Sequence, residues 1–424
     1  MIRIIKVTNV EKFAAKIIPK QPQKNKTIVE SILKNVKKNG DDAIRKYEKK
    51  FTGANLSSLR LTQTEIKNAY SKVSKTELSA LRLAKARLEK TESIIKSILK
   101  NKTINNDGIK ISKKFIPIQS VGCYIPGGLA KYPSSVIMSV VPAKVAGVKR
   151  VVVVSPPNSD GKIDPLTIVA ANICGANEIY KTGGAQSIAA LSYGTKTISK
   201  VDKIVGPGGS FVTTAKSLLS DQTGIDMIAG PTELGIIADN STNPKFVALD
   251  LISQAEHSSD TFCYLITTSE KLAKSVSKII SELLSKIQRG NIVKSSLKNN
   301  GFIAICRTKS DMIKLANTLA PEHLEIMAKN PESLSSKITT PGLILLGNNT
   351  PSSASDYVLG SNHILPTNGF GKIRGSLSVL DFIKVSTQVT CSKLSLSKIS
   401  KYLEVLTNAE GLPNHYEAVR GRLK

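Results

Sequence analysis

Tryptophan is absent from this sequence of 424 residues, and all aromatic residues together make up only 4% of it. The formal net charge is nonetheless +28, and Lys outnumbers Arg 49 to 11. Proteins that hold single strands stack bases on aromatic rings, and proteins that read bases favour the bidentate Arg side chain. The composition therefore argues against a nucleic-acid partner, and we expect the lysines to form a solvated surface.

Cysteine is also scarce, with five residues that stand far apart and form no Cys-x-x-Cys pair. A disulfide framework needs an even, patterned set of cysteines, and a thiolate zinc cluster needs closely spaced ones. The sequence offers neither pattern. We expect small, buried apolar side chains at these positions, which are Cys123, Cys174, Cys263, Cys306 and Cys391.

Long apolar runs are missing, since none reaches the roughly 18 residues of a membrane helix. The most apolar region, 136–154, is interrupted by Lys144, Lys149 and Arg150. The first residues carry neither the apolar core nor the small-residue cleavage site of a signal peptide. We therefore expect no membrane partner and a cytoplasmic location.

The usual phosphate-binding fingerprints are missing too. The segment GPGGSF has Phe211 where the last glycine of Gly-x-Gly-x-x-Gly is needed, and GFGKIR has Arg374 there. No P-loop motif occurs either. Any dinucleotide site in this protein must be built differently from the usual one.

What the sequence does contain is a change of pattern near residue 115. Residues 24–104 repeat apolar positions at three- and four-residue spacing, which is typical of amphipathic helices. From there on, short apolar strands such as 150–155 alternate with helical segments at a spacing of roughly 25 residues. This alternation predicts an α/β fold with two wound units on mainly parallel sheets. The tail from about 383 reads as helical and is too polar to form a domain alone.

All four histidines stand in polar segments, beside carboxylates, glycines or prolines. Gln254 and His257 are three residues apart at the end of a predicted helix, so both can face one ion. Glu322 stands next to His323 at the start of a predicted strand, a pairing that suits a general base with a carboxylate neighbour. An exposed acidic loop is the alternative reading of that pair.

The other two histidines lie farther along the chain. Asp356 and His363 share a loop interrupted by Gly and Pro, and Glu410 and His415 lie in the tail. A mixture of oxygen and imidazole donors without thiolates suits zinc, or a similar divalent ion with positions open for substrate. A satisfied structural histidine is the alternative at each place.

Three glycine-containing segments accompany predicted strands. In 122–128, glycines allow a ligand to approach the backbone closely. The segment 183–191 begins a helix and offers free N–H groups to a phosphate or carboxylate. The segment 229–239 adds the hydroxyl of Thr232 and the carboxylate of Glu233 at a turn into a strand. Tight strand–helix turns that bind no ligand are the alternative.

Taken in order, these segments resemble the histidinol dehydrogenase family across nearly the whole chain. The matching segments are GCYIPGG, GGAQSIAAL, GPGG, AGPTE, QAEH, PEHLE, SDYVLGSNH, SVLDF and AEGLPNH. Such an ordered series is far more specific than any one motif. The resemblance implies a zinc-dependent enzyme that oxidises L-histidinol through the aldehyde to L-histidine. This four-electron reaction uses two NAD and is the last step of histidine biosynthesis.

The same resemblance implies which residues form the site. His323 would take the alcohol proton as hydride leaves for NAD, and Glu322 would activate the water that adds to the aldehyde. The ligands of one zinc ion per subunit would be Gln254, His257, Asp356 and His415. The residues that contact the substrate would be Thr232, Gln254, His257, His323, Asp356, His363, Glu410 and His415.

For the cofactor, the resemblance implies that Tyr124 and Gln186 contact NAD. Two positions differ from the commonest family pattern. Thr232 stands where Ser is frequent, which keeps the hydroxyl, and Gly209 stands where Asn usually contacts NAD. One lost hydrogen bond costs about 0.5–1.5 kcal/mol, which weakens NAD binding by up to roughly tenfold.

The resemblance also implies an architecture of two Rossmann-like domains, one inserted in the other, in a homodimer with shared active sites. Glu410 and His415 would reach into the partner's site, which accounts for the polar tail. The expected parts are an N-terminal segment (1–20), a main α/β domain carrying the metal and catalytic residues (21–123 and 232–380), an inserted Rossmann-like domain (124–231) and a helical tail (381–424).

Three other readings compete with this one. An aldehyde dehydrogenase would need an activated thiol, for which Cys123 is the one plausible candidate. A nucleic-acid-binding protein would be retained on DNA in a salt-dependent manner. A zinc hydrolase would form its product without any NADH.

Overall fold

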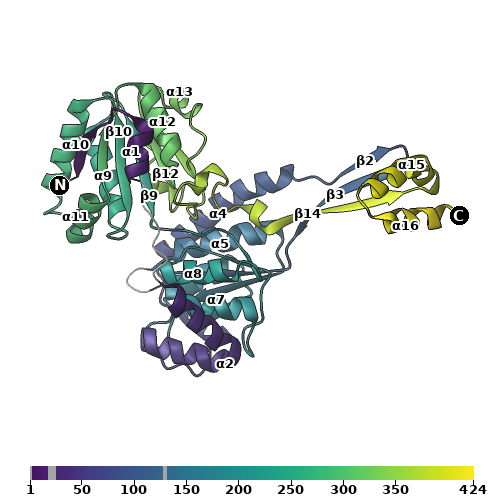
Figure 1. Ribbon diagram of the computed structural model, residues 1–424. Helices are drawn as coiled ribbons and strands as arrows, with labels where there is room; N and C mark the ends of the chain where they lie inside the picture. Colours follow the sequence, from purple (N-terminus) through teal and green to yellow (C-terminus); the bar gives the residue numbers. More distant parts are fainter. Residues whose placement is uncertain (1, 18–24, 128–130) are drawn as a thin grey trace.

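A five-stranded parallel sheet organises the first of two α/β bodies in the computed structural model, which describes residues 2–17, 25–127 and 131–424 (Figure 1). Its strand order is β6-β5-β4-β7-β8. The strands are β4 (Ser120–Tyr124), β5 (Arg150–Ser155), β6 (Glu178–Lys181), β7 (Lys203–Val205) and β8 (Gly224–Ile225). The apolar run 151–154 is fully buried because helices cover both faces of the sheet.

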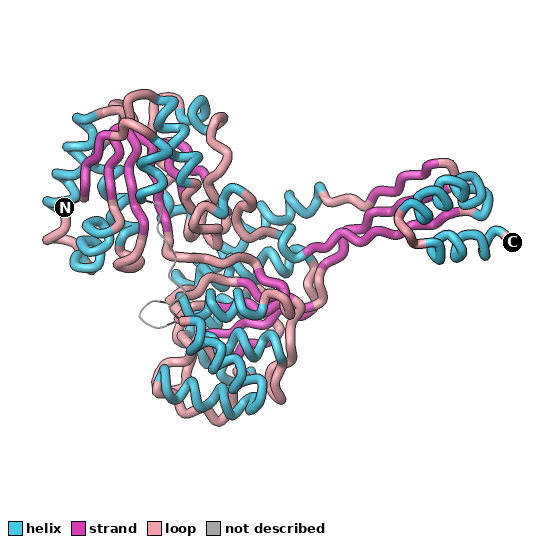
Figure 2. Tube along the Cα trace, viewed as in Figure 1, coloured by secondary structure: helices cyan, strands magenta, loops and turns pink. Residues whose placement is uncertain are grey.

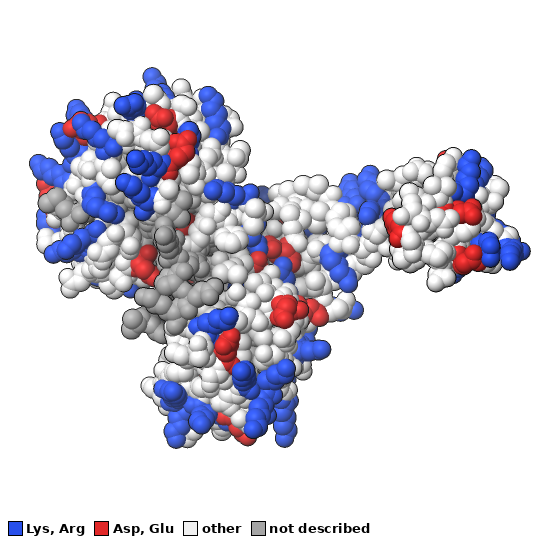
Figure 3. All heavy atoms as spheres, in the orientation of Figure 1, with Lys and Arg blue, Asp and Glu red and all other residues white. Residues whose placement is uncertain are grey.

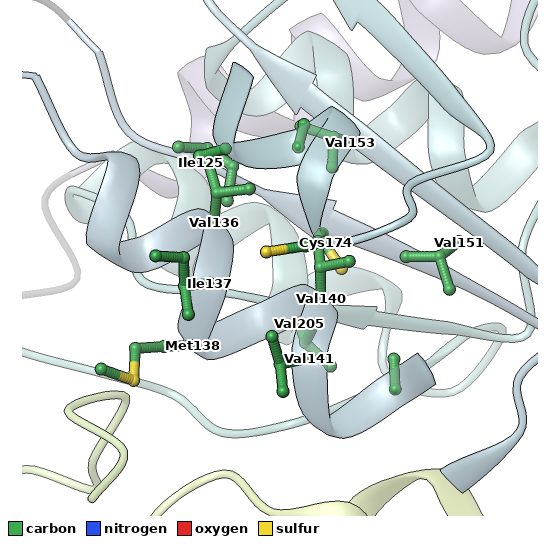
Figure 4. Close-up of a cluster of buried hydrophobic side chains, with 14 of the residues drawn as sticks. Ile125, Val136, Ile137, Met138, Val140, Val141, Val151, Val153, Cys174 and Val205 are labelled. Atoms are coloured by element: carbon green, nitrogen blue, oxygen red, sulfur yellow. The ribbon is translucent and has the colours of Figure 1, made fainter. Parts of the chain in front are cut away.

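Helices that connect these strands lie on both faces of the sheet. They are α5 (Pro133–Ala146), α6 (Pro165–Ile173), α7 (Gly184–Tyr193) and α8 (Ser210–Leu219). Figure 4 shows one of the resulting apolar clusters, in which Val136 and Val140 of α5 lie beside Val153 of β5 and Val205 of β7. This continuous packing fixes the turns at the carboxyl ends of the strands.

The helical N-terminal region also packs on this first body. The helices involved are α2 (Lys26–Thr52), α3 (Gln63–Tyr70) and α4 (Lys75–Ile98). The first contacts α7 and α8, the second α6, and the third α5. We expected 21–123 to group with 232–380; the apolar faces of these helices are buried largely against the segment 124–231, and α4 also packs against residues 364–379.

A six-stranded parallel sheet organises the second body, in the order β1-β11-β10-β9-β12-β13. Its strands are β1 (Arg3–Lys6), β9 (Glu233–Ala238), β10 (Phe262–Thr267), β11 (Phe302–Ile305), β12 (His323–Met327) and β13 (Leu343–Leu346). Its helices are α1 (Val10–Ile17), α9 (Pro244–Ala255), α10 (Glu270–Leu283), α11 (Gly290–Asn299), α12 (Lys309–Leu319) and α13 (Pro331–Ser335). The predicted α/β class with two wound parallel sheets is confirmed.

The N-terminal segment belongs to this second body. Strand β1 pairs in parallel with β11 from Arg3 to Lys6, and α1 packs on α12. The predicted boundary at residue 20 lies outside the described residues. The last glycine of the segment 122–128 lies outside them as well.

An arm projects from the two bodies (Figures 1 and 2). It consists of an antiparallel sheet of β2 (Lys102–Asn106), β3 (Ile109–Pro117) and β14 (Ile383–Cys391), followed by α15 (Lys393–Ala409) and α16 (Pro413–Leu423). The two terminal helices pack on each other at its end. The expected helical tail from 381 is wrong at its start, because 383–391 pairs with β3 along its whole length.

Short elements link β13 to the arm, and they complete the surroundings of the site. They are α14 (Ser352–Ser355) and the 3₁₀ helices η1 (Phe370–Lys372) and η2 (Val379–Phe382). On the face seen in Figure 3, Lys and Arg are spread over both bodies and the arm, with Asp and Glu among them. Among the described residues, no helix is both long and apolar enough to cross a membrane.

Candidate active site

A cavity of about 300 Å³ lies between the two bodies. The first body lines it with the turns that follow β4 and β7, at the carboxyl edge of its sheet. The second body lines it with residues that precede β9 and β12, at the amino edge of its sheet. The lining side chains include Ser135, Asp226, Thr232, Gln254, His257, Glu322, His323, Asp356, Tyr357 and His363.

The two edges offer different chemistry. The carboxyl edge presents Gly206, Gly208 and Gly209, and such an edge is where open parallel sheets bind nucleotides. Gly206 has a φ of +113°, and a Cβ there would meet the Tyr124 carbonyl, so only glycine fits this turn. The amino edge presents the titratable side chains.

A chain of hydrogen bonds orders the amino edge. Glu322 Oε2 accepts from Thr232 Oγ1 at 2.6 Å and from the Glu233 N–H at 2.9 Å. Thr232 Oγ1 in turn accepts from Gln254 Nε2 at 2.8 Å. Gln254 lies in the last turn of α9, and Glu322 precedes β12. The hydrogen bonds of Thr232 therefore connect the end of this helix to the start of this strand. The Gln254 side-chain oxygen is left available to a ligand.

His323 is buried between two carboxyl groups. Its Nδ1 lies 3.8 Å from Glu322 Oε2, and its Nε2 lies 3.4 Å from Asp356 Oδ1. Neither nitrogen has a hydrogen-bond partner among the described residues, and the same holds for Asp356 Oδ1. Burial lowers the pKa of His323, but the charges of Glu322 and Asp356 outweigh it and raise that pKa to about 9. The imidazole is thus tuned by its carboxylate neighbours.

The remaining two histidines of the cavity have fixed tautomers. His257 Nδ1 lies 3.2 Å from the Gln254 carbonyl, and His363 Nδ1 lies 2.7 Å from the Asp356 carbonyl. A carbonyl only accepts, so each Nδ1 carries the proton and each Nε2 keeps a lone pair. The Nε2 of His363 meets Ser135 Oγ at 3.3 Å, and burial lowers the pKa of this histidine.

These atoms can be tested as metal ligands. The lone pair of His257 Nε2, the buried Asp356 Oδ1 and the free oxygen of Gln254 are the donor types that zinc accepts. A carbonyl behind the imidazole is also the usual outer partner of a metal-bound histidine. Within the described part of one chain, however, no three His, Cys, Asp or Glu side chains gather closely enough to hold an ion. The donor types fit zinc, but the described residues do not by themselves form a complete ligand set.

Two of the predicted site residues lie elsewhere in the chain. Glu410 is the C-cap residue that follows α15, and His415 lies in α16, so both are on the exposed arm (Figure 1). Neither lines the cavity. In a single chain, therefore, the structure brings together Thr232, Gln254, His257, Glu322, His323, Asp356 and His363 but not the pair on the arm.

The predicted NAD contacts lie behind the cavity wall. Tyr124 and Gln186 are buried, and neither lines the cavity. The Tyr124 hydroxyl accepts the Gly184 N–H at 3.4 Å, and burial raises its pKa to about 12. Gln186 Nε2 donates at 2.9 Å to Glu48, a carboxylate from α2 that no sequence motif pointed to. Gln186 Oε1 has no partner among the described residues.

Sequence reasoning also missed several wall residues. Ser135, Asp226 and Tyr357 line the cavity from three distant parts of the chain. Two of them carried a local signal, since Tyr357 lies within the SDYVLGSNH segment and Asp226 shortly precedes AGPTE. The rival thiol, Cys123, is fully buried in the core, and burial raises its pKa far above the ordinary thiol range, which is unsuited to a nucleophile.

The fold and the cavity together define an α/β enzyme with a buried histidine–carboxylate centre. A sequence model of the histidinol dehydrogenase family matches residues 18–423. Histidinol dehydrogenase of Methanocaldococcus jannaschii is 43% identical over 398 residues, covering 94% of this chain and 92% of that protein. The enzyme of Gloeobacter violaceus is 41% identical over 421 residues, covering 98% of this chain and 94% of that protein.

A solved structure agrees with these relatives. The crystal structure of histidinol dehydrogenase from Elizabethkingia anophelis matches with a TM-score of 0.93 at 34% identity, and the match covers 100% of this chain and 98% of that one. The chain therefore belongs to the histidinol dehydrogenase family. It is an NAD-dependent oxidoreductase, as the ordered segments of its sequence predicted.

Proposed function

We propose that this protein oxidises L-histidinol through the aldehyde to L-histidine, the last step of histidine biosynthesis, with two NAD per turnover. The observation that carries the proposal is His323, held between Glu322 and Asp356 in a cavity that also contains Gln254 and His257. A base, a second carboxylate and a set of metal donors around one cavity suit two successive oxidations of one bound substrate.

A zinc ion would be held by Gln254, His257 and Asp356 together with His415 of a second chain. When bound, it would hold the imidazole and amine groups of histidinol and leave the proton transfers to the protein. A cation bound to Asp356 would partly neutralise the charge of this carboxylate, so its electrostatic effect on His323 would be weaker. Part of the interaction that raises the pKa of His323 is then removed, which favours the neutral imidazole that a base requires.

In the first oxidation, His323 takes the hydroxyl proton of the alcohol while the carbon gives its hydride to NAD, leaving the aldehyde. In the second, Glu322 takes a proton from water as the water oxygen bonds to the aldehyde carbon, and the carbonyl oxygen takes back the proton that His323 holds, which gives the hydrate and a neutral His323. The hydrate then loses a hydride to a second NAD and a hydroxyl proton to His323. Atoms and charges balance with two NADH per histidine. Thr232 and His363 would contact the substrate beside these groups.

The cofactor is proposed to lie along the carboxyl edge of the first body. The glycines at 206, 208 and 209 allow close approach there, and the unpaired Gln186 Oε1 beside Gly184 is an acceptor suited to a hydroxyl or amide of NAD. Tyr124 holds the same turn through Gly184. In this arrangement, 124–231 is the cofactor-binding unit, and 232–380 carries the catalytic residues.

We propose that two chains form a dimer with two active sites. Glu410 and His415 of each chain would enter the cavity of the other chain. The arm supports this arrangement because six apolar side chains of β14 and α15 are more than half exposed in one chain. They are Val385, Val389, Leu394, Tyr402, Val405 and Leu406. An interface of two arms would cover them and bring the missing donors to the metal set.

The test is to supply L-histidinol and NAD, and to count the NADH formed per histidine. We expect two, without accumulation of free aldehyde. One NADH per turnover with release of the aldehyde would contradict the four-electron reaction. Formation of a product from a histidinol ester or amide without any NADH would instead favour a zinc hydrolase.

A further inference from the structure

Glu233 and Glu322 form a reciprocal pair at the edge of the cavity. The Glu322 N–H donates to Glu233 Oε2 at 3.1 Å, and the Glu233 N–H donates to Glu322 Oε2 at 2.9 Å. The second oxygen of Glu233 accepts the Asn368 N–H at 2.9 Å. Both carboxyl groups are buried, with 4% of Glu233 and 7% of Glu322 exposed. Each carboxyl group therefore holds the backbone that carries the other.

Glu322 and His323 are adjacent, but different contacts hold them. His323 opens β12 and is paired on both sides, with Leu234 of β9 and with Leu343 of β13. Glu322 precedes this ladder. Its carbonyl accepts from the Leu343 N–H at 3.0 Å, and its own N–H is bound only by Glu233. Loss of the Glu233 carboxyl group would remove the one contact to the Glu322 N–H and loosen the start of this segment, while the sheet still holds His323.

We propose that Glu233 is a positioning residue for the second oxidation, because it fixes the carboxylate that activates water without fixing the base of the first oxidation. This inference rests on the proposed function, in which the two oxidations use His323 and Glu322 differently. In the water-addition step, an O–H bond of water breaks and its proton goes to Glu322. A new C–O bond forms at the aldehyde carbon as the carbonyl π bond opens, and the carbonyl oxygen takes the proton that His323 holds. That step requires Glu322 at the right place, whereas alcohol oxidation does not.

The experiment feeds the two half-reactions separately to the zinc-loaded protein, using L-histidinol in one assay and its amino aldehyde in the other. The variants are Glu233→Ala and Glu233→Gln. The amide keeps one acceptor oxygen, so Gln can hold the Glu322 N–H or the Asn368 N–H but not both. Glu92→Ala is the matched control, because Glu92 is a buried carboxylate that accepts the Val379 N–H at 2.6 Å and does not line the cavity.

We expect Glu233→Ala to slow aldehyde oxidation by about 10²-fold, the scale of a misplaced catalytic group, while alcohol oxidation keeps its rate. Free aldehyde should then be captured by a carbonyl-trapping reagent during turnover of L-histidinol, and NADH per histidinol should fall from two toward one. Glu233→Gln should lie between Glu233→Ala and the unaltered protein. Glu92→Ala should lower the melting temperature but leave the ratio of the two rates unchanged.

Two results would overturn the inference alone. In one, the unaltered protein oxidises both substrates and Glu233→Ala lowers the two rates by the same factor. In the other, both rates stay unchanged in both variants at Glu233. An unaltered protein that oxidises neither substrate would instead overturn the proposed function, and the inference with it.

Discussion

The cavity and the arm hold their polar side chains in opposite ways. In the cavity, Thr232, Glu322 and His323 are fixed by short contacts and by the ends of packed strands. On the arm, Glu410 and His415 are exposed on helices that pack only lightly on the rest of the chain. One chain therefore carries a preformed cavity, and we propose that the exposed side chains of the arm act in the cavity of a second chain.

Metal removal should have the largest effect, because the ion would draw on both regions. We expect a chelator to abolish activity and added zinc or manganese to restore it. The fold should persist, since Gln254, His257 and Asp356 come from structured segments of the second body. Measuring the enzyme activity would test the metal requirement, and far-ultraviolet circular dichroism of the same samples would test whether the fold persists. Full activity in the metal-free protein would reject the ligand set.

Replacing one histidine from each region should separate their roles. His323→Asn should lower kcat by about 10²–10⁴-fold, the contribution of a positioned base, with metal content unchanged. His415→Asn should instead weaken zinc binding, because the arm would supply a ligand. Metal analysis beside steady-state rates distinguishes the two. If His323→Asn loses the ion, the roles assigned to the cavity histidines are exchanged.

A smaller effect is expected at the carboxyl edge of the first body, on the side of the cavity opposite the titratable side chains. Gly209 is the N-cap residue of α8 and has an extended backbone conformation with a φ of −66°. A Cβ built there meets nothing within 4 Å. Asn fits this position without strain and should add one hydrogen bond to NAD. Gly209→Asn should therefore tighten NAD binding by at most about tenfold, as measured by calorimetry. Weaker binding would mean that the loop is adapted to glycine.

The sequence predicted the cavity better than the arm. Apolar strands such as β5 and ordered segments such as PEHLE are local signals, so the α/β class and seven cavity residues followed from them. Strand β14 was missed although Ile383, Val385, Val389 and Cys391 alternate with polar residues, a pattern typical of a strand.

Contacts between distant segments could not be predicted from local sequence patterns. Nothing local indicates that β1 joins β11, that α2 packs on α7 or that Glu48 binds Gln186. Each of these contacts joins segments that are distant along the chain, and either partner alone looks like an ordinary amphipathic or polar segment. The reciprocal bonds of Glu233 and Glu322 have the same origin, since they depend on β9 and β12 being neighbours.

The most direct measurement of the central claim, a site shared between two chains, is complementation between His323→Ala and His415→Ala. Each variant alone should be inactive, the first without its base and the second without an arm ligand. Co-expression should make about half of the dimers mixed, and one of the two sites in each mixed dimer would be intact. Activity should then return to about one quarter of that of the unaltered protein. If mixed dimers form and activity stays at the level of the separate variants, His415 serves its own chain and the shared site is wrong.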